Sequence, residues 1–103
     1  MQEVALLGRA PVAPLDLVGA VAAIAARDPK QPFAYVVTIN AQILLLAEDP
    51  RTGLRAAHED AWLRLNDSGI LARLHRWALQ EDVPIAAGSD LCVALLNGAI
   101  RPE

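Results

Sequence analysis

The segment YVVTINAQILLLAEDP, residues 35–50, joins two apolar runs through a polar junction, and this change of pattern decides the fold class. Residues 33–39 are mostly β-branched and aromatic with little alternation, which is typical of a strand covered on both faces. Asn40 is suited to cap a following helix, which Asp49 and Pro50 interrupt. The segment therefore predicts a buried strand, a polar turn that includes Thr38, and a helix, as in an α/β sheet.

The rest of the chain repeats this alternation. Residues 4–7 form an apolar run closed by Gly8 and Pro11, which predicts a strand, and Asp16 precedes a helical pattern. Residues 61–65 predict a third strand, and residues 83–87 a weak strand or extended segment. Helices are expected at residues 51–59, 70–80 and 91–96, the last capped by residues 88–90. Residues 1–103 are therefore predicted to form a single α/β domain with a mostly parallel sheet of three to four strands and helices on both faces, a partial Rossmann-like arrangement.

Composition limits the classes of function. The 103 residues are 54% hydrophobic and 20% charged, which excludes a disordered chain. Because so much aliphatic surface on a short chain favours burial against a partner, we expect a homo-oligomer. The net charge is −3 and no basic stripe is present, so we expect no nucleic acid partner.

The expected compartment is the cytoplasm. The single Cys92 cannot form an internal disulfide, which fits a reducing environment. The N-terminal residues lack the charged and apolar regions of a signal peptide, and the longest bland stretch, residues 17–26, is too short to cross a bilayer. Peripheral contact with the inner membrane face remains open.

Polar side chains follow two of the predicted strands. Thr38 and Asn40 end the second strand, and Asn66 and Asp67 end the third. Because ligands of open parallel sheets collect at the carboxyl ends of the strands, we expect these side chains to meet at one edge. An aspartate there is suited to act as a general base toward a substrate hydroxyl. Gly88 would let a ligand approach the backbone closely.

Each of these residues also has a purely structural interpretation. Asn40, Asp67, Ser89 and Asp90 are common helix caps or turn formers, and capping is the more frequent role of such residues. No paired Cys, His-x-x-x-His or Asp-x-Asp pattern predicts a metal site. The remaining polar and aromatic residues are expected in ordinary positions: His58 and His75 solvated, Cys92 in the core, and Trp62 and Trp77 in the core or an interface.

Four motifs in this order resemble those of the WecG/TagA/CpsF glycosyltransferases, glycosyltransferase family 26. They are the strand end at residues 37–40 (VTIN), the Asp49-Pro50 break, the turn at residues 66–68 (NDS) and the helix start at residues 88–90 (GSD). Residues 6–24, LLGRAPVAPLDLVGAVAAI, also resemble the opening strand, turn and first helix of the family. Family members are longer chains, so the resemblance is to their N-terminal portion.

The resemblance implies a hexosyl transfer in bacterial cell-wall or surface polysaccharide synthesis. The donor would be a UDP-linked sugar such as N-acetylmannosamine, and the acceptor a polyprenyl-diphosphate-linked saccharide at the cytoplasmic membrane face. The implied reaction is inverting, metal-independent and free of cofactors. Asp67 takes the role of general base, while Thr38 and Asn40 line the substrate pocket. The matching turn and helix start add five substrate-binding candidates: Asn66, Ser68, Gly88, Ser89 and Asp90.

Two other readings stay open. The chain could be a truncated, non-catalytic relative that acts as an oligomeric binding or assembly module, since a short sheet leaves an open edge that self-association would cover. An unrelated nucleotide-binding α/β domain is the third reading, although the G-x-G-x-x-G fingerprint expected of one is missing.

Overall fold

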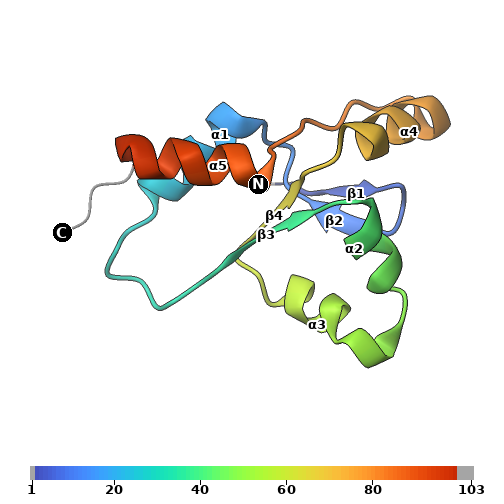
Figure 1. Cartoon of the computed structure of the whole chain (residues 1–103), viewed down its shortest axis with the longest axis horizontal. Coiled ribbons are helices and arrows are strands. Elements are labelled where there is room, and N and C mark those ends of the chain that lie inside the picture. The colour runs from blue at the N-terminus through green and yellow to red at the C-terminus, as the bar shows by residue number, and fades with distance from the viewer. Residues whose placement is uncertain (1, 100–103) are drawn as a thin grey trace.

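The computed structural model describes residues 2–99, in which two small sheets are surrounded by helices (Figure 1). Strands β1 (Val4–Leu6) and β2 (Ala10–Val12) form an antiparallel hairpin. Strands β3 (Val36–Ile39) and β4 (Leu63–Asn66) pair in parallel, with Val36 opposite Leu63 and Ile39 opposite Asn66. The ends of the predicted domain, residues 1 and 100–103, lie outside the described residues.

The α/β character is confirmed, but the expected sheet of three to four mostly parallel strands is not. The four strands form two separate two-stranded sheets, one of which is antiparallel. Of the two alternatives for residues 83–87, the weak strand is wrong, because no strand forms there and the segment is irregular. Pro84 lacks a backbone N–H, and one bond, from Ala86 N to Asn66 O at 2.8 Å, links the segment to the end of β4. The hairpin strand β2 was not predicted.

Helices follow each strand of the parallel pair. Helix α1 (Leu17–Ala26) precedes β3, and α2 (Ala41–Leu46) follows it. A 3₁₀ turn η1 (Pro50–Thr52) and helix α3 (Leu54–Glu59) lead to β4. Helix α4 (Gly69–Leu79) follows β4, and α5 (Gly88–Ala94) continues into the π-helical turn η2 (Leu95–Ala99).

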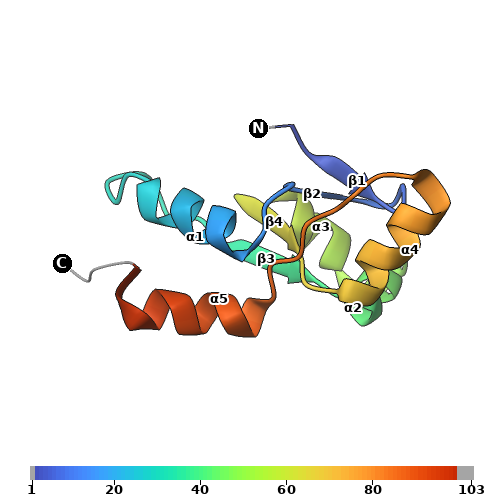
Figure 2. The same cartoon turned by 90° about the horizontal axis from the view of Figure 1, so that it is seen from above.

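The parallel pair is covered on both faces, as its continuous apolar pattern predicted. One core lies between this pair, the hairpin and helices α2 and α4, and the other between the pair and helices α1 and α5 (Figures 1 and 2). Leu65 is opposite Thr38, the residue before Ile39 in β3. Because successive side chains of a strand point to opposite faces, Ile39 belongs to the first core and Leu65 to the second. The first core contains Leu6, Val12, Ile39, Leu44, Leu71 and Val83, and the second contains Ala13, Ala20, Leu63, Leu65, Ala86 and Leu91.

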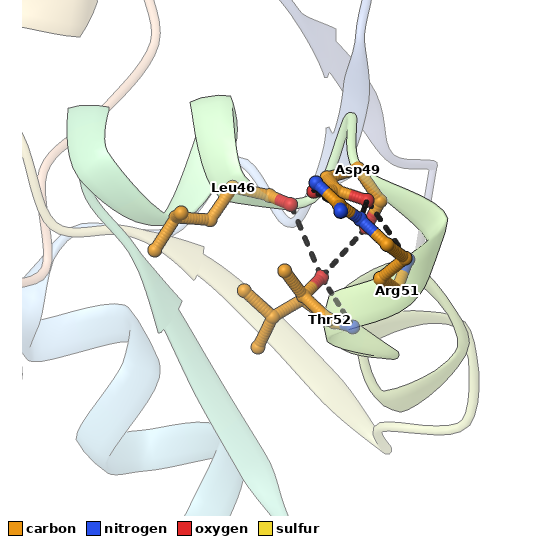
Figure 3. A network of polar contacts seen from close by, with 5 residues as sticks. Leu46, Asp49, Arg51 and Thr52 are labelled. Carbon is orange, nitrogen blue, oxygen red and sulfur yellow. Dashed lines mark hydrogen bonds and ion pairs between the residues drawn. The ribbon is translucent and has the colours of Figure 1, made fainter.

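The predicted break at Asp49-Pro50 separates α2 from α3 through a compact polar turn (Figure 3). The Asp49 carboxylate accepts from Arg51 N at 2.9 Å and pairs with the Arg51 guanidinium at 2.8 Å. The Thr52 hydroxyl lies 3.1 Å from Leu46 O and 2.9 Å from Asp49 O, so it ties the end of α2 to the turn. The Arg51 guanidinium, followed by the Arg51 backbone N–H, holds the pKa of Asp49 below its ordinary value.

Two expectations about exposure are wrong. His75 is fully buried rather than solvated, and Cys92 is exposed rather than part of the core. His75 Nδ1 accepts from Leu7 N at 2.8 Å, so its Nε2 carries the proton and donates to Glu81 Oε1 at 2.9 Å. The imidazole thereby ties α4 to the hairpin turn.

The tryptophans lie at the surface rather than in the core. Trp77 is 79% exposed, and Trp62 is 39% exposed with the Arg27 guanidinium 5.3 Å from its ring centroid. Core packing is therefore wrong for both tryptophans, and interface packing stays a prediction. Among residues 2–99, no helix has the length and apolar character needed to span a membrane.

Candidate active site

The carboxyl ends of β3 and β4 lie side by side. Ile39 is opposite Asn66, and Asp67 N donates to Ile39 O at 2.9 Å, so the ladder extends one residue past β4. Val36 and Leu65 belong to the core that α1 and α5 cover, and side chains two residues apart in a strand share a face. Thr38 and Asp67 therefore lie on that same side. The two strand ends are therefore adjacent, as predicted, but of the four polar side chains expected to meet there only Thr38 and Asp67 line the same groove.

Thr38 and Asp67 line one open groove of about 550 Å³, a volume typical of small-molecule sites. Gly88 and Ser89, at the start of α5, complete its polar end. The rest of the lining is mostly aliphatic and comes from α1, β3, α5 and η2: Ile24, Val36, Leu91, Cys92 and Leu95. The groove thus has a polar end at the strand termini and an apolar end along α5.

The Asp67 carboxylate is partly buried and accepts one hydrogen bond from the described residues. Its Oδ1 accepts a hydrogen bond from Gly88 N at 3.2 Å. Its Oδ2 receives none from the residues that the structure describes. Neither oxygen caps the helix that follows Asp67 in sequence, because Ser68 fills that position for α4, and Oδ1 instead bonds to the first N–H of α5. One carboxylate oxygen therefore remains available to a ligand in the groove.

Gly88 lies against Thr38 at close range. A Cβ at position 88 would be 2.9 Å from Thr38 Oγ1 and 3.4 Å from Thr38 Cγ2. Because Cβ atoms do not approach other atoms that closely, only glycine fits here without displacement of the threonine. Glycine at this position brings α5 onto β3 and closes the polar end of the groove.

Three of the other candidate residues hold the strand-to-helix junctions instead of lining this groove. Asn40 Oδ1 accepts from Ile43 N at 2.9 Å and so caps α2. Asn66 is fully buried, and its amide bonds to Ser68 N at 3.0 Å and Ser68 O at 3.2 Å. Ser68 Oγ accepts from Leu71 N at 3.1 Å.

The start of α5 differs from the expectation. The helix begins at Gly88 with Ala87 at the N-cap; Ala87 has no capping side chain, and the first N–H of the helix donates to Asp67 Oδ1. The predicted capping by residues 88–90 is therefore wrong. Ser89 lines the groove, whereas Asp90 is exposed in the first turn of α5 and outside the groove lining.

A second polar cavity, of about 120 Å³, is bordered by Ile39 and Leu44, which belong to the opposite core. Sequence analysis did not find it. Its cations are compensated: Arg9 pairs with Glu48, and Arg64 pairs with Glu3 at 2.8 Å. Burial, followed by the Arg64 charge, lowers the pKa of His58 in its wall. Since Arg64 also donates to the carbonyls of His58 and Ala61, this network serves to hold α3 to β4.

Neither cavity contains a metal-binding constellation. Within residues 2–99, no group of three or more His, Cys, Asp or Glu side chains is placed to hold a metal ion. Of the described residues that line the groove, Asp67 is the single carboxylate.

Comparison with known proteins matches residues 4–103 to the glycosyl transferase WecG/TagA/CpsF family. No curated protein and no solved structure matches the chain. The family match covers nearly the whole sequence and includes all four motifs, three of which contribute residues to the groove. The chain therefore belongs to the WecG/TagA/CpsF family of glycosyltransferases.

Proposed function

We propose that this chain transfers a hexosyl unit, with Asp67 as the general base. The observation that carries the proposal is that Asp67 faces the groove with a free carboxylate oxygen while its neighbours hold the backbone. The acceptor hydroxyl oxygen forms the new bond to the anomeric carbon, and Asp67 removes its proton. The bond from that carbon to the nucleoside diphosphate breaks, and the leaving diphosphate takes the electron pair.

The groove composition supports a single displacement with inversion. Double displacement at a sugar, which gives retention, typically uses a pair of carboxylates, and among the described residues Asp67 is the one carboxylate in the groove lining. We also propose metal-independent transfer, because divalent cations in such sites are bound by several oxygen ligands and the groove offers one carboxylate.

The proposed donor is a UDP-linked hexose of the N-acetylmannosamine type, and the acceptor is a polyprenyl-diphosphate-linked saccharide. The transfer would serve cell-surface polysaccharide synthesis at the cytoplasmic membrane face. Family membership and the polar end of the groove support this choice. Thr38 and Ser89 would bind sugar hydroxyls there, and Gly88 would shape the polar end of the groove by letting α5 lie against Thr38. Asp90 would contact the ligand from outside the groove.

Three candidate residues have roles in the proposal that differ from the ligand contacts implied by the resemblance. Asn40 and Ser68 would act by capping the helices that follow the strands, and Asn66 by fixing the turn around Asp67. These three are positioning residues in the proposal, since their polar atoms are already engaged.

The test is transfer of labelled hexosamine from the UDP-sugar to a lipid-linked saccharide. Asp67→Asn keeps the size of the side chain but removes the base, so we expect turnover to fall about 10²- to 10⁴-fold. Asp60→Asn, an exposed carboxylate at the end of α3, serves as control. EDTA should leave the rate unchanged, and NMR should show an inverted anomeric centre. Turnover of Asp67→Asn near that of the Asp60 control would contradict the proposal.

The second candidate function is an oligomeric assembly module. It is favoured by the open edge of β3, which pairs with β4 alone among the described strands. Light scattering and a thermal shift with UDP separate the two functions. A multimer without a UDP response favours assembly, whereas a UDP response favours transfer.

A further inference from the structure

The carboxylate of Asp67 is held at one of its two oxygens by the backbone of another element. Gly88 N, the first N–H of α5, donates to Asp67 Oδ1 at 3.2 Å across 21 residues of sequence. Among the described residues no second donor reaches the carboxylate, so this is the one hydrogen bond that restricts its rotation. Oδ2 is thereby left for a ligand in the groove that Asp67 lines.

The position of this N–H is fixed from two sides. Ala86, two residues before Gly88, donates its N–H to Asn66 O at 2.8 Å, so the start of α5 is tied to the end of β4. A Cβ at position 88 would lie 2.9 Å from Thr38 Oγ1, so the start of α5 also rests against β3. The N–H therefore meets Asp67 from a preset direction, with no flexible side chain between the two groups.

A capping role alone is the alternative explanation of the contact. The first N–H groups of a helix lack partners within the helix, and carboxylates are favourable there. The usual cap is the side chain at the N-cap position itself, but Ala87 has none, and the acceptor comes instead from the single carboxylate among the described residues of the groove. A cap contributes to stability, whereas a contact that orients a base contributes to the rate of transfer. The two explanations thus predict different measurements.

We propose that the Gly88 N–H is a positioning group for Asp67, which turns Oδ2 of the carboxylate toward the acceptor hydroxyl. The inference rests on the proposed function and adds a residue to it. Gly88 contacts no reacting atom and acts through the carboxylate. A general base removes a proton efficiently only within hydrogen-bond reach and in the correct direction, so loss of the N–H lowers the rate of the chemical step more than the affinity for substrate.

The hydrogen bond itself is tested by NMR of the chain with isotope-labelled glycine. An ionised carboxylate accepts a stronger hydrogen bond than a neutral carboxyl group, so the Gly88 amide proton should move to higher field as the pH falls from about 7 to about 3. Gly8, whose N–H donates to Ala5 O at 3.0 Å, is the internal control and should move less. A Gly88 signal that does not titrate, or that titrates equally in Asp67→Asn, would overturn the proposal.

A matched pair of variants removes the N–H. Proline has no N–H and is favoured at the first position of a helix. Ala87 precedes it with φ −65° and ψ 131°, a conformation compatible with a following proline. Because any Cβ at position 88 meets Thr38, both variants carry Thr38→Ala. In this background Gly88→Ala keeps the N–H and Gly88→Pro lacks it, and we expect the two to unfold at similar urea concentrations.

The kinetic comparison is made within this pair. We expect kcat for hexosyl transfer to be about tenfold lower in the proline variant than in its alanine partner, with the same KM for the acceptor in both. With Asp67→Asn added to each, no base is present to be oriented, so the two kcat values should become equal. Equal kcat with Asp67 present, or a tenfold difference that persists with Asp67→Asn, would overturn the proposal.

Failure of this inference can be told apart from failure of the proposed function. Normal turnover by Asp67→Asn would remove Asp67 as the base and overturn both, whatever the variants at position 88 show. If Asp67→Asn is inactive while the proline and alanine variants turn over equally, Asp67 remains the base, and the positioning role of Gly88 alone is overturned.

Discussion

The two strand-to-helix junctions of the parallel pair lie next to each other and are built differently. After β3, the single residue Asn40 both ends the strand and caps α2. After β4, two residues separate the strand from α4: Asp67 follows the buried Asn66, and Ser68 caps the helix. The longer junction gives capping and turn formation to other residues. The side chain between them is therefore free to face the groove.

A polar residue at a strand end is therefore available for chemistry only when another residue of the junction caps the helix and forms the turn. Asn40 and Asp67 resemble each other in sequence, because each follows a buried strand and precedes an amphipathic or apolar helix. Asn40 Oδ1 accepts a hydrogen bond of 2.9 Å from Ile43 N, whereas Asp67 Oδ1 accepts a longer one, of 3.2 Å, from Gly88 N.

The longer junction should depend most on Asn66. Asn66→Ala removes two hydrogen bonds at a fully buried position and leaves Ser68 N without its partner, while Ser68 O keeps its bond from Ala72 N, so we expect a loss of about 2 kcal/mol in unfolding free energy. Urea unfolding followed by circular dichroism measures it. The exposed Asn97→Ala is the control. A loss no larger than that of the control would remove Asn66 from its role in the turn.

The approach of α5 to the junction is the next test. Gly88→Ala places a methyl group 2.9 Å from Thr38 Oγ1, and such overpacking should cost about 1–2 kcal/mol. Thr38→Ala removes the clashing atoms, so the double variant should recover most of the loss. Additive losses in the same urea experiment would show that residues 38 and 88 are not in contact.

The two caps should be equivalent and have the smallest effect. Asn40→Ala and Ser68→Ala each remove one side-chain acceptor at a helix N-terminus, with an expected loss of about 1 kcal/mol. Thermal unfolding of the two variants in parallel provides the comparison. Full stability of Asn40→Ala would break the assignment of Asn40 as a cap and return it to the candidate ligand-binding residues.

Sequence analysis predicted the junctions well because their signals are local. Asn40 before an apolar helix and the Asn66–Gly69 turn specify their own backbone conformations through side chains a few residues away. The β-branched and aromatic run at residues 33–39 likewise predicted a strand with a core on each face, although only Val36–Ile39 form it.

The features that escaped prediction depend on contacts between distant segments. The hairpin turn places Leu7 and Gly8 at positive φ (51° and 69°), and a leucine is not a usual turn residue. Leu7 N is held there by His75, which is 68 residues away. The burial of His75 escaped prediction for the same reason, because α4 has an amphipathic pattern even when His75 is counted among its polar residues. The exposure of Cys92, on the groove side of α5, also follows from tertiary packing.

The central claim is that Asp67 is reactive because of the junction it occupies, and not because a carboxylate lies near the strand ends. Exchange of the two junction residues, Asn40 and Asp67, tests this claim most directly. Aspartate and asparagine are equally good helix caps, so Asn40→Asp combined with Asp67→Asn should fold like the unmodified chain. Its carboxylate would then be engaged at Ile43 N. We predict that hexosyl transfer by the exchange variant is as low as that of Asp67→Asn alone. Recovery of transfer in the exchange variant would contradict this account.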